Sequence, residues 1–140
     1  MIIVDTNVVS EPMQVRPSAA VVAWLDRQAA ETLFLTSVNL AELLVGVEAL
    51  PAGRRTSGLR TALGDLLASL FGPRILPFDA EAAKTYAVLV ARASAAGHAI
   101  SVADGQIAAI ATLNGFAVAT RDVAPFKAAG VTVIDPWSEA

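Results

Sequence analysis

The sequence predicts a single α/β domain, a three-layer sandwich in which helices cover both faces of a mainly parallel sheet. Short unbroken apolar runs alternate with longer amphipathic segments, a pattern typical of parallel strands joined by helices. The chain has 140 residues, of which 55% are hydrophobic, so it can bury a substantial core. It contains no internal repeat, linker or low-complexity tract. We therefore expect one domain spanning residues 1–140.

Composition excludes several classes of site. The chain has no cysteine and one histidine, His98, which excludes disulfides, thiolate metal sites and His-rich zinc sites. The net charge of −3 argues against a protein that binds nucleic acid through basic side chains alone, but not against a metal-using nuclease. No apolar stretch reaches membrane-spanning length without interruption, and Asp5 comes too early for a secretory signal. We expect a cytoplasmic protein without membrane contact.

The first half of the chain predicts two strands and three helical segments. Met1 to Val4 form an apolar run of the kind found in a central buried strand. Ser18 is a favoured N-cap for a helix over 19–29, and Ser37 is expected to open a helix that Pro51 ends. The expected elements are a strand at 1–4, a helical turn at 8–12, a helix at 19–29, a strand at 33–36 and a helix at 38–50.

The second half continues the alternation. Leucines at helical spacing predict a helix that Gly72 and Pro73 end, and Pro77 indicates a strand at the edge of the sheet. Asp79 is a favoured cap for a long Ala-rich helix. The expected elements are a helix at 59–70, a strand at 75–78, helices at 80–96 and 101–113, a strand at 116–120, a helical turn at 126–129 and a strand at 131–134.

Four acids fall where a parallel sheet would gather them. Asp5 ends the first strand, and Asp122 follows the strand at 116–120. Glu42 lies on the helix after the second strand, and Asp104 lies in the first turn of the helix opened by Ser101. The ends of parallel strands and the starts of the following helices share one edge, so the four carboxylates can meet there.

Each acid also has a purely structural interpretation. Asp5 can cap a helix starting at Thr6, and Asp122 can cap the turn before Phe126. Asp104 and Ser101 fit a variant of the capping box. Glu42 has apolar neighbours, which makes its burial costly unless it is paired or exposed to solvent. Taken singly, these acids leave both interpretations open.

Taken together, the four acids predict a metal site. Two carboxylates ~4 Å apart repel by roughly 4 kcal/mol at an effective dielectric of about 20, so a cluster raises its pKa values or recruits a cation. Oxygen ligands without His or Cys suit Mg²⁺ or Mn²⁺, which can polarise a phosphodiester and activate water. The hydroxyl and amide groups of Thr6, Asn7 and Thr120 are candidates to orient that water or a phosphate.

With these four acids and the segments around them, the chain resembles a PIN-domain ribonuclease of the VapC toxin type, within the FitB-like subgroup. The resemblance spans essentially the whole chain, up to a closing segment at 133–137, and four motifs in order make it specific. The matching segments are Val4-Asp5-Thr6-Asn7-Val8-Val9-Ser10-Glu11, Leu40-Ala41-Glu42-Leu43, Ile100-Ser101-Val102-Ala103-Asp104-Gly105-Gln106-Ile107-Ala108-Ala109, and Ala119-Thr120-Arg121-Asp122 with Phe126.

The resemblance implies a five-stranded parallel sheet of order 3-2-1-4-5 and an RNA-cleaving enzyme that uses Mg²⁺ or Mn²⁺. Carried over by position, Asp5, Glu42, Asp104 and Asp122 would be the catalytic, metal-binding acids, with Thr120 the accompanying hydroxyl. The family often has Asn at the last position, so Asp122 adds a charge. The resemblance also implies a homodimer, and a VapB-like antitoxin that fills the acidic pocket with a basic side chain, with a higher assembly as a further expectation.

Outside the acids, Arg54, Arg55 and Arg121 are candidate contacts to RNA phosphates, although a solvated basic surface is the simpler interpretation. A receiver-type phosphoacceptor would need an acid pair after the first strand, and a phosphatase would need Asp-x-Asp where Asn7 stands. The main alternative is a catalytically silent module that binds RNA or a partner. The complete set of four acids favours the metal-dependent endoribonuclease, the toxin of a type II toxin–antitoxin pair.

Overall fold

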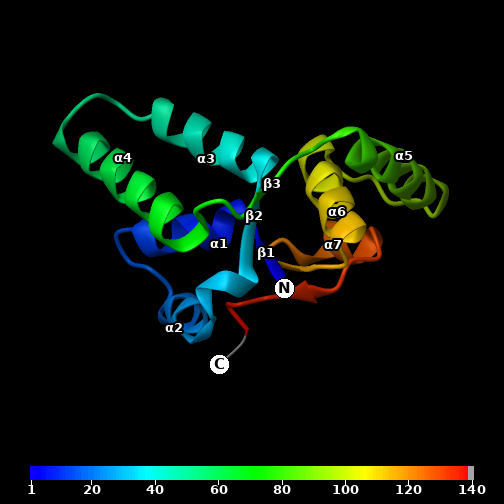
Figure 1. The fold of residues 1–140 in the computed structure, drawn as a ribbon, viewed down its shortest axis with the longest axis horizontal. Helices are drawn as coiled ribbons and strands as arrows, with labels where there is room; N and C mark the ends of the chain where they lie inside the picture. Colours follow the sequence, from blue (N-terminus) through cyan, green and yellow to red (C-terminus); the bar gives the residue numbers. More distant parts are fainter. Residues whose placement is uncertain (139–140) are drawn as a thin grey trace.

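The computed structural model describes residues 1–138 as a central parallel sheet between two layers of helices (Figure 1). The last two residues of the predicted 1–140 domain lie outside the described part. All pairings are parallel, and the strand order β3-β2-β1-β4-β5 confirms both the fold class and the expected order. The strands are β1 (Ile2–Val4), β2 (Leu33–Thr36), β3 (Ile75–Leu76), β4 (Ala117–Ala119) and β5 (Val133–Ile134).

The central strand β1 is covered by helices on both faces of the sheet. Ile3 pairs with Phe34 of β2 and with Val118 of β4. Successive side chains of a strand point to opposite faces. Accordingly, Val4 joins one apolar cluster and Ile3 the other, and both side chains are fully buried. An uninterrupted apolar run is therefore what this position requires.

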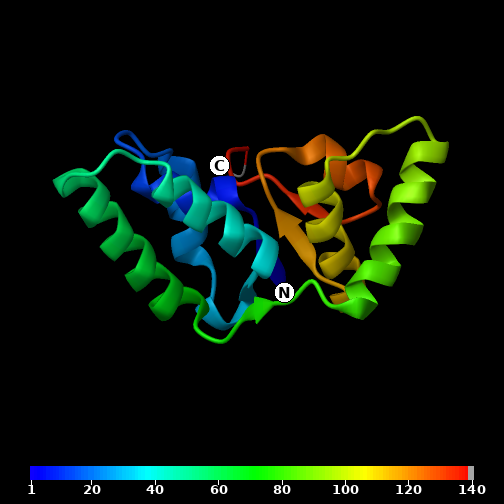
Figure 2. The same ribbon diagram turned by 90° about the horizontal axis from the view of Figure 1, so that it is seen from above.

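The first face of the sheet is covered by the helices from the first half of the chain, which Figures 1 and 2 show on one side of the strands. Trp24 is buried here and packs in the apolar cluster on this face. The helices are α1 (Thr6–Ser10), α2 (Ala19–Arg27), α3 (Ser37–Glu48) and α4 (Arg54–Leu66), with short 3₁₀ turns η1 (Glu11–Met13) and η2 (Ala30–Thr32) and a π-helical segment η3 (Leu67–Phe71) after α4.

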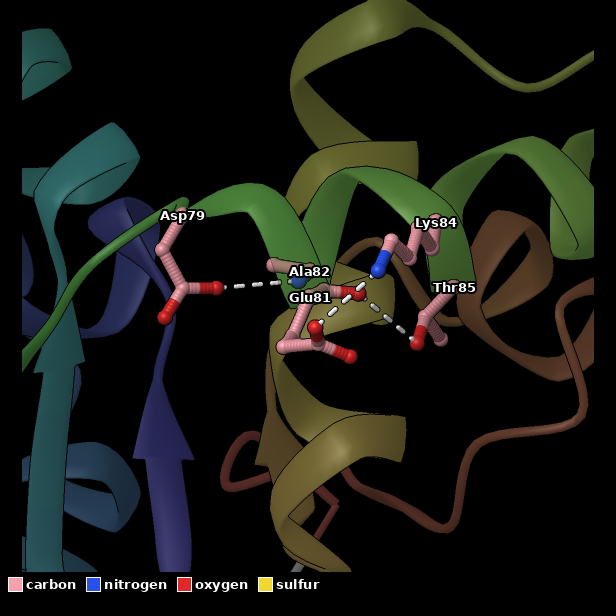
Figure 3. Close-up of polar contacts among 5 residues, drawn as sticks. All are labelled: Asp79, Glu81, Ala82, Lys84 and Thr85. Atoms are coloured by element: carbon pink, nitrogen blue, oxygen red, sulfur yellow. Dashed lines mark hydrogen bonds and ion pairs between the residues drawn. The ribbon is translucent and has the colours of Figure 1, made fainter.

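The opposite face is covered by α5 (Ala80–Ala95), α6 (Val102–Asn114) and α7 (Val123–Ala128). Asp79 caps α5 by accepting a hydrogen bond from the Ala82 amide at 2.9 Å, and the first turns carry a Glu81–Lys84 ion pair (Figure 3). Apolar side chains of α6 and α7 pack on the second cluster against Ile3. The two clusters together form the core of a three-layer sandwich.

Some boundaries differ from the sequence prediction. Thr36, not Ser37, caps α3, because its hydroxyl accepts from the Asn39 amide while the Asn39 side chain reaches back to Thr36. Asp122 occupies the N-cap position of α7, but its side chain makes no capping hydrogen bond. Strand β3 lies at the edge of the sheet, as Pro77 indicated. Within the described residues, no helix is long and apolar enough to cross a membrane.

Candidate active site

The four predicted acids come from four different elements at the carboxyl edge of the sheet. Asp5 follows β1 and Asp122 follows β4, while Glu42 lies on α3 and Asp104 in the first turn of α6. They are close enough that the charges of Asp5 and Asp104 act on Glu42, and the charges of Asp5 and Asp122 act on Asp104. The topology therefore brings the four carboxylates to one region, as expected from the parallel sheet.

Asp5 is the most tightly held of the four acids. Its side chain is 6% exposed. Its Oδ1 accepts from the Thr6 amide at 2.8 Å and from Asn39 Nδ2 at 3.0 Å, and its Oδ2 accepts from the Thr120 hydroxyl at 2.7 Å. The bond from Thr6 shows that Asp5 caps α1, and the same residue lies in the acidic cluster, so capping does not exclude the predicted site role.

Glu42 is exposed, and this corrects the argument from burial. Its neighbours Leu40 and Leu44 were expected to make burial costly, but Leu44 is itself 48% exposed. The carboxylate lies on the open side of α3, where its Oε1 accepts a hydrogen bond from the Thr6 hydroxyl at 3.0 Å. Glu42 thus belongs to the cluster through a hydrogen bond and through proximity, and its carboxylate is only partly shielded from solvent.

Thr120 supports Asp5 from the β4 side. Its fully buried hydroxyl donates to Asp5 and accepts from the Asp122 amide at 3.0 Å and from Asn7 Nδ2 at 3.4 Å. Asn7 Oδ1 accepts from the Arg121 amide at 3.2 Å. These bonds connect the first turn of α1 to the loop that carries Asp122. Because the Thr120 side chain is buried, it orients Asp5 and does not reach solvent.

The electrostatics of the site disfavour three of its negative charges. Burial raises the pKa of Asp5, against the hydrogen bonds from Thr120, Thr6 and Asn39, and the charge of Asp122 raises it further. Partial burial also raises the pKa of Glu42 and of Asp104, against a hydrogen bond in each case, and neighbouring carboxylates add to both shifts. A bound cation would relieve this repulsion.

The donor set fits a hard divalent cation. Only oxygen donors are present, which suits Mg²⁺ or Mn²⁺. Within residues 1–138, no group of three or more Asp, Glu or His side chains is arranged so that it could hold a metal ion by itself. Mg²⁺ does not need three protein ligands, because it keeps several waters and binds through one or two carboxylates.

Asn39 is the site residue that the sequence interpretation missed. It lies on α3, is fully buried, and bonds to both Asp5 and Thr6 through its side-chain nitrogen. An available signal was the spacing Thr36-x-x-Asn39, which resembles a capping box and marks a polar side chain just after a buried strand. That signal predicts a helix start, but not a contact with Asp5.

Of the three candidate RNA contacts, Arg55 and Arg121 lie beside acids of the cluster. Arg55 lines a groove of about 350 Å³ between α1, α3 and α4 that also contains Glu42 and Thr6. Arg54 is exposed but lines a different hollow beside the α3–α4 loop. Arg121 is exposed next to Asp122, and its guanidinium lies 5.0 Å from the centroid of the Trp137 ring. His98 is an exposed surface residue.

Comparison with known proteins agrees with this geometry. Residues 2–131 match the PIN domain family. The chain is 49% identical to the VapC ribonuclease Y4jK of Sinorhizobium fredii, with 100% of both chains covered. It is 43% identical to the toxin FitB of Neisseria gonorrhoeae, covering 99% of this chain and 100% of FitB. The crystal structure of FitAcB from Neisseria gonorrhoeae superposes with a TM-score of 0.94 at 43% identity, covering 99% of each chain. This chain is a member of the PIN domain family.

Proposed function

We propose that this protein is a metal-dependent endoribonuclease and the toxin component of a type II toxin–antitoxin pair. The observation that carries the proposal is the buried Asp5 carboxylate, held by three donors beneath three further acids at the carboxyl edge of the sheet. Full-length identity of 49% to a VapC ribonuclease and 43% to a toxin supports both parts. A ribonuclease acting on cellular RNA would work in the cytoplasm.

Asp5, Glu42, Asp104 and Asp122 would hold the ion, with Mg²⁺ as the proposed metal and Mn²⁺ as a plausible substitute. A bound ion of this kind supplies Lewis-acid polarisation of a phosphodiester and makes water more acidic. Asp5 provides a preorganised carboxylate, because its three hydrogen bonds fix its orientation before any ligand arrives. Glu42 and Asp122 are exposed, so their carboxylates can reach an RNA strand and its attacking water.

The groove beside Glu42 supports the proposal of an antitoxin partner. Its apolar lining comes from η1, α3 and α4 and includes Met13 and Val47, and Glu42 is among its lining residues. Leu44 and Val45 of α3 are 48% and 68% exposed. An extended or helical segment with apolar residues and one basic residue would match both features. The resemblance to FitB-like toxins also leads us to propose a homodimer.

Cleavage of RNA by the purified protein, freed of antitoxin, tests the enzymatic proposal. We expect mixed RNAs to be cut with Mg²⁺ or Mn²⁺ and to survive in EDTA. Asp5→Asn and Asp104→Asn should reduce cleavage by about 100-fold or more, because several kcal/mol of transition-state stabilisation are lost. Cleavage that persists in EDTA, or that these variants leave undiminished, would exclude the mechanism. If no RNA is cut under any condition, the silent RNA- or partner-binding module becomes the better description.

A further inference from the structure

We infer that Asn39 is a positioning residue that fixes the Asp5 and Glu42 carboxylates relative to each other for a divalent cation. The inference rests on the proposed function, because it assumes that these two acids hold the ion. Asn39 is fully buried and acts through other side chains: its nitrogen bonds to Asp5 and to Thr6, and Thr6 in turn bonds to Glu42.

The orientation of the Asn39 amide is determined by Thr36. The Asn39 Oδ1 accepts from the Thr36 hydroxyl at 2.6 Å and from the Thr36 backbone amide at 3.3 Å. A flipped amide would place its NH₂ group against the backbone N–H donor, so only one orientation satisfies both partners. The nitrogen of Asn39 therefore faces the acidic cluster.

The direction of the hydrogen bonds then follows from counting protons. The two Nδ2 protons of Asn39 go to Asp5 Oδ1 at 3.0 Å and to Thr6 Oγ1 at 3.2 Å. Thr6 accepts one proton from Asn39, so its own single proton is free for Glu42 Oε1 at 3.0 Å. A directed chain thus runs from Asn39 through Thr6 to Glu42, and the same amide nitrogen holds Asp5.

This chain links two carboxylates that lie on different elements. Asp5 belongs to the end of β1, whereas the exposed Glu42 side chain would otherwise sample many rotamers on α3. The capping box at the start of α3 holds Asn39 rigidly beneath both acids. Side chains that orient metal ligands in this way lower the cost of ordering them when the ion binds.

Titration of the metal-free full chain with Mn²⁺ alone, followed by calorimetry, measures this contribution without any RNA. Asn39→Leu is close in size and removes both donors, and we expect Mn²⁺ to bind about 10- to 100-fold more weakly. The control is Asn114→Leu, the same change at the exposed C-terminal end of α6, where the side chain donates to the Ile110 carbonyl. The control should bind Mn²⁺ within about twofold of the parent.

A double-mutant cycle separates positioning from a general loss of stability. Thr6→Val keeps the bond from Asn39 to Asp5 but interrupts the link to Glu42, so it too should weaken Mn²⁺ binding. Combining it with Asn39→Leu should cost less than the product of the two separate effects, because both changes interrupt one chain. If Asn39→Leu does not fold, Thr6→Val still tests the link from Asn39 through Thr6 to Glu42, since Thr6 lies at the half-exposed start of α1 and unchanged Mn²⁺ affinity would overturn that link.

The outcomes distinguish the inference from the proposed function. Mn²⁺ binding that Asn39→Leu leaves within about twofold of the parent, or a cycle whose effects simply multiply, would overturn the positioning role alone. Unchanged Mn²⁺ affinity in Thr6→Val would do the same. Failure of the unsubstituted protein to bind Mn²⁺ at all would overturn the metal-dependent function together with the inference.

Discussion

At the scale of single residues, the site is a cluster of acids whose negative charges repel one another when no cation is bound. The pKa values of Asp5, Glu42 and Asp104 are all raised above their ordinary values, mainly by desolvation and further by neighbouring carboxylates, of which Asp122 acts on Asp5 and Asp104. At neutral pH the ionised carboxylates therefore lower the free energy of unfolding of the metal-free protein. A bound cation would offset this loss of stability, because its positive charge favours the ionised carboxylates.

Removing one acid should stabilise the metal-free protein. The folded-state pKa of Asp104 is raised above its ordinary value of 3.8, so the unfolded chain loses its proton first as the pH rises. The resulting loss of stability begins above that ordinary value and is complete once the pH exceeds the folded-state pKa. In EDTA at neutral pH, urea denaturation should show Asp104→Asn to be more stable than the parent. The gain should vanish as the pH falls toward 3.8, and a variant less stable at neutral pH would contradict this account.

Arg55 offers a second test at this scale, because it shares a groove with Glu42. If it contacts RNA phosphates, Arg55→Gln should raise KM and leave kcat unchanged. The slope of log affinity against log salt should become shallower by about 1. Arg92→Gln is the matched control, since Arg92 lies on α5 in the opposite layer of helices. Equal effects from the two changes would show that only net charge matters.

At the scale of elements, the position of Asp104 depends on how closely α6 packs against α5. Gly105 follows Asp104 directly, and a Cβ built on it would lie 2.8 Å from Tyr86 Cε2. The Tyr86 ring is itself held edge-on against Phe78, with centroids 5.9 Å apart. The half-buried Tyr86 ring thus lies between Phe78 and the Gly105 backbone, and glycine at 105 allows the close approach of the two helices.

Two glycine substitutions should therefore have opposite signs. Gly105→Ala should destabilise the fold by about 1–3 kcal/mol through overpacking against Tyr86. Gly64→Ala in α4 has no atom within 4 Å of the new Cβ and should stabilise by roughly 0.5–1 kcal/mol, as expected for a helix interior. Chemical denaturation of both variants measures the difference. A stabilising Gly105→Ala would mean that Tyr86 moves aside without cost.

At the scale of the whole molecule, the sheet joins two separate apolar clusters and carries the acids at one edge. The helices of the first half contribute Glu42, and α6 on the opposite layer contributes Asp104. An ion bound between them would connect the two layers through the site. Metal binding should therefore raise the melting temperature of the whole domain as well as support activity.

Thermal unfolding with and without the ion tests this coupling. At an ion concentration about 100 times its Kd, binding to the native state contributes about 2.7 kcal/mol, which corresponds to roughly 5–10 °C in Tm for a chain of this size. Mn²⁺ or Mg²⁺ should raise Tm by this amount, and Asp104→Asn should abolish most of the rise. Equal shifts in the parent and the variant would place the ion elsewhere on the protein.

The sequence determined the fold class and the location of the acids. Apolar runs such as Met1–Val4 identify buried strands because a central parallel strand must be apolar on both faces. Acids that follow strands, as Asp5 and Asp122 do, are then confined to the carboxyl edge by the topology alone. The resemblance supplied the strand order, which the structure confirms.

Only the tertiary structure decided how those acids are held. Local pattern cannot report a contact between residues 34 positions apart, such as the bond from Asn39 to Asp5. It also suggested a costly burial for Glu42, because the neighbouring leucines read as a core face when α3 in fact leaves Leu44 exposed. The order of strands, helices and acids along the chain can be predicted from local sequence patterns. Exposure and hydrogen-bond partners follow from packing between distant segments, which only the folded molecule defines.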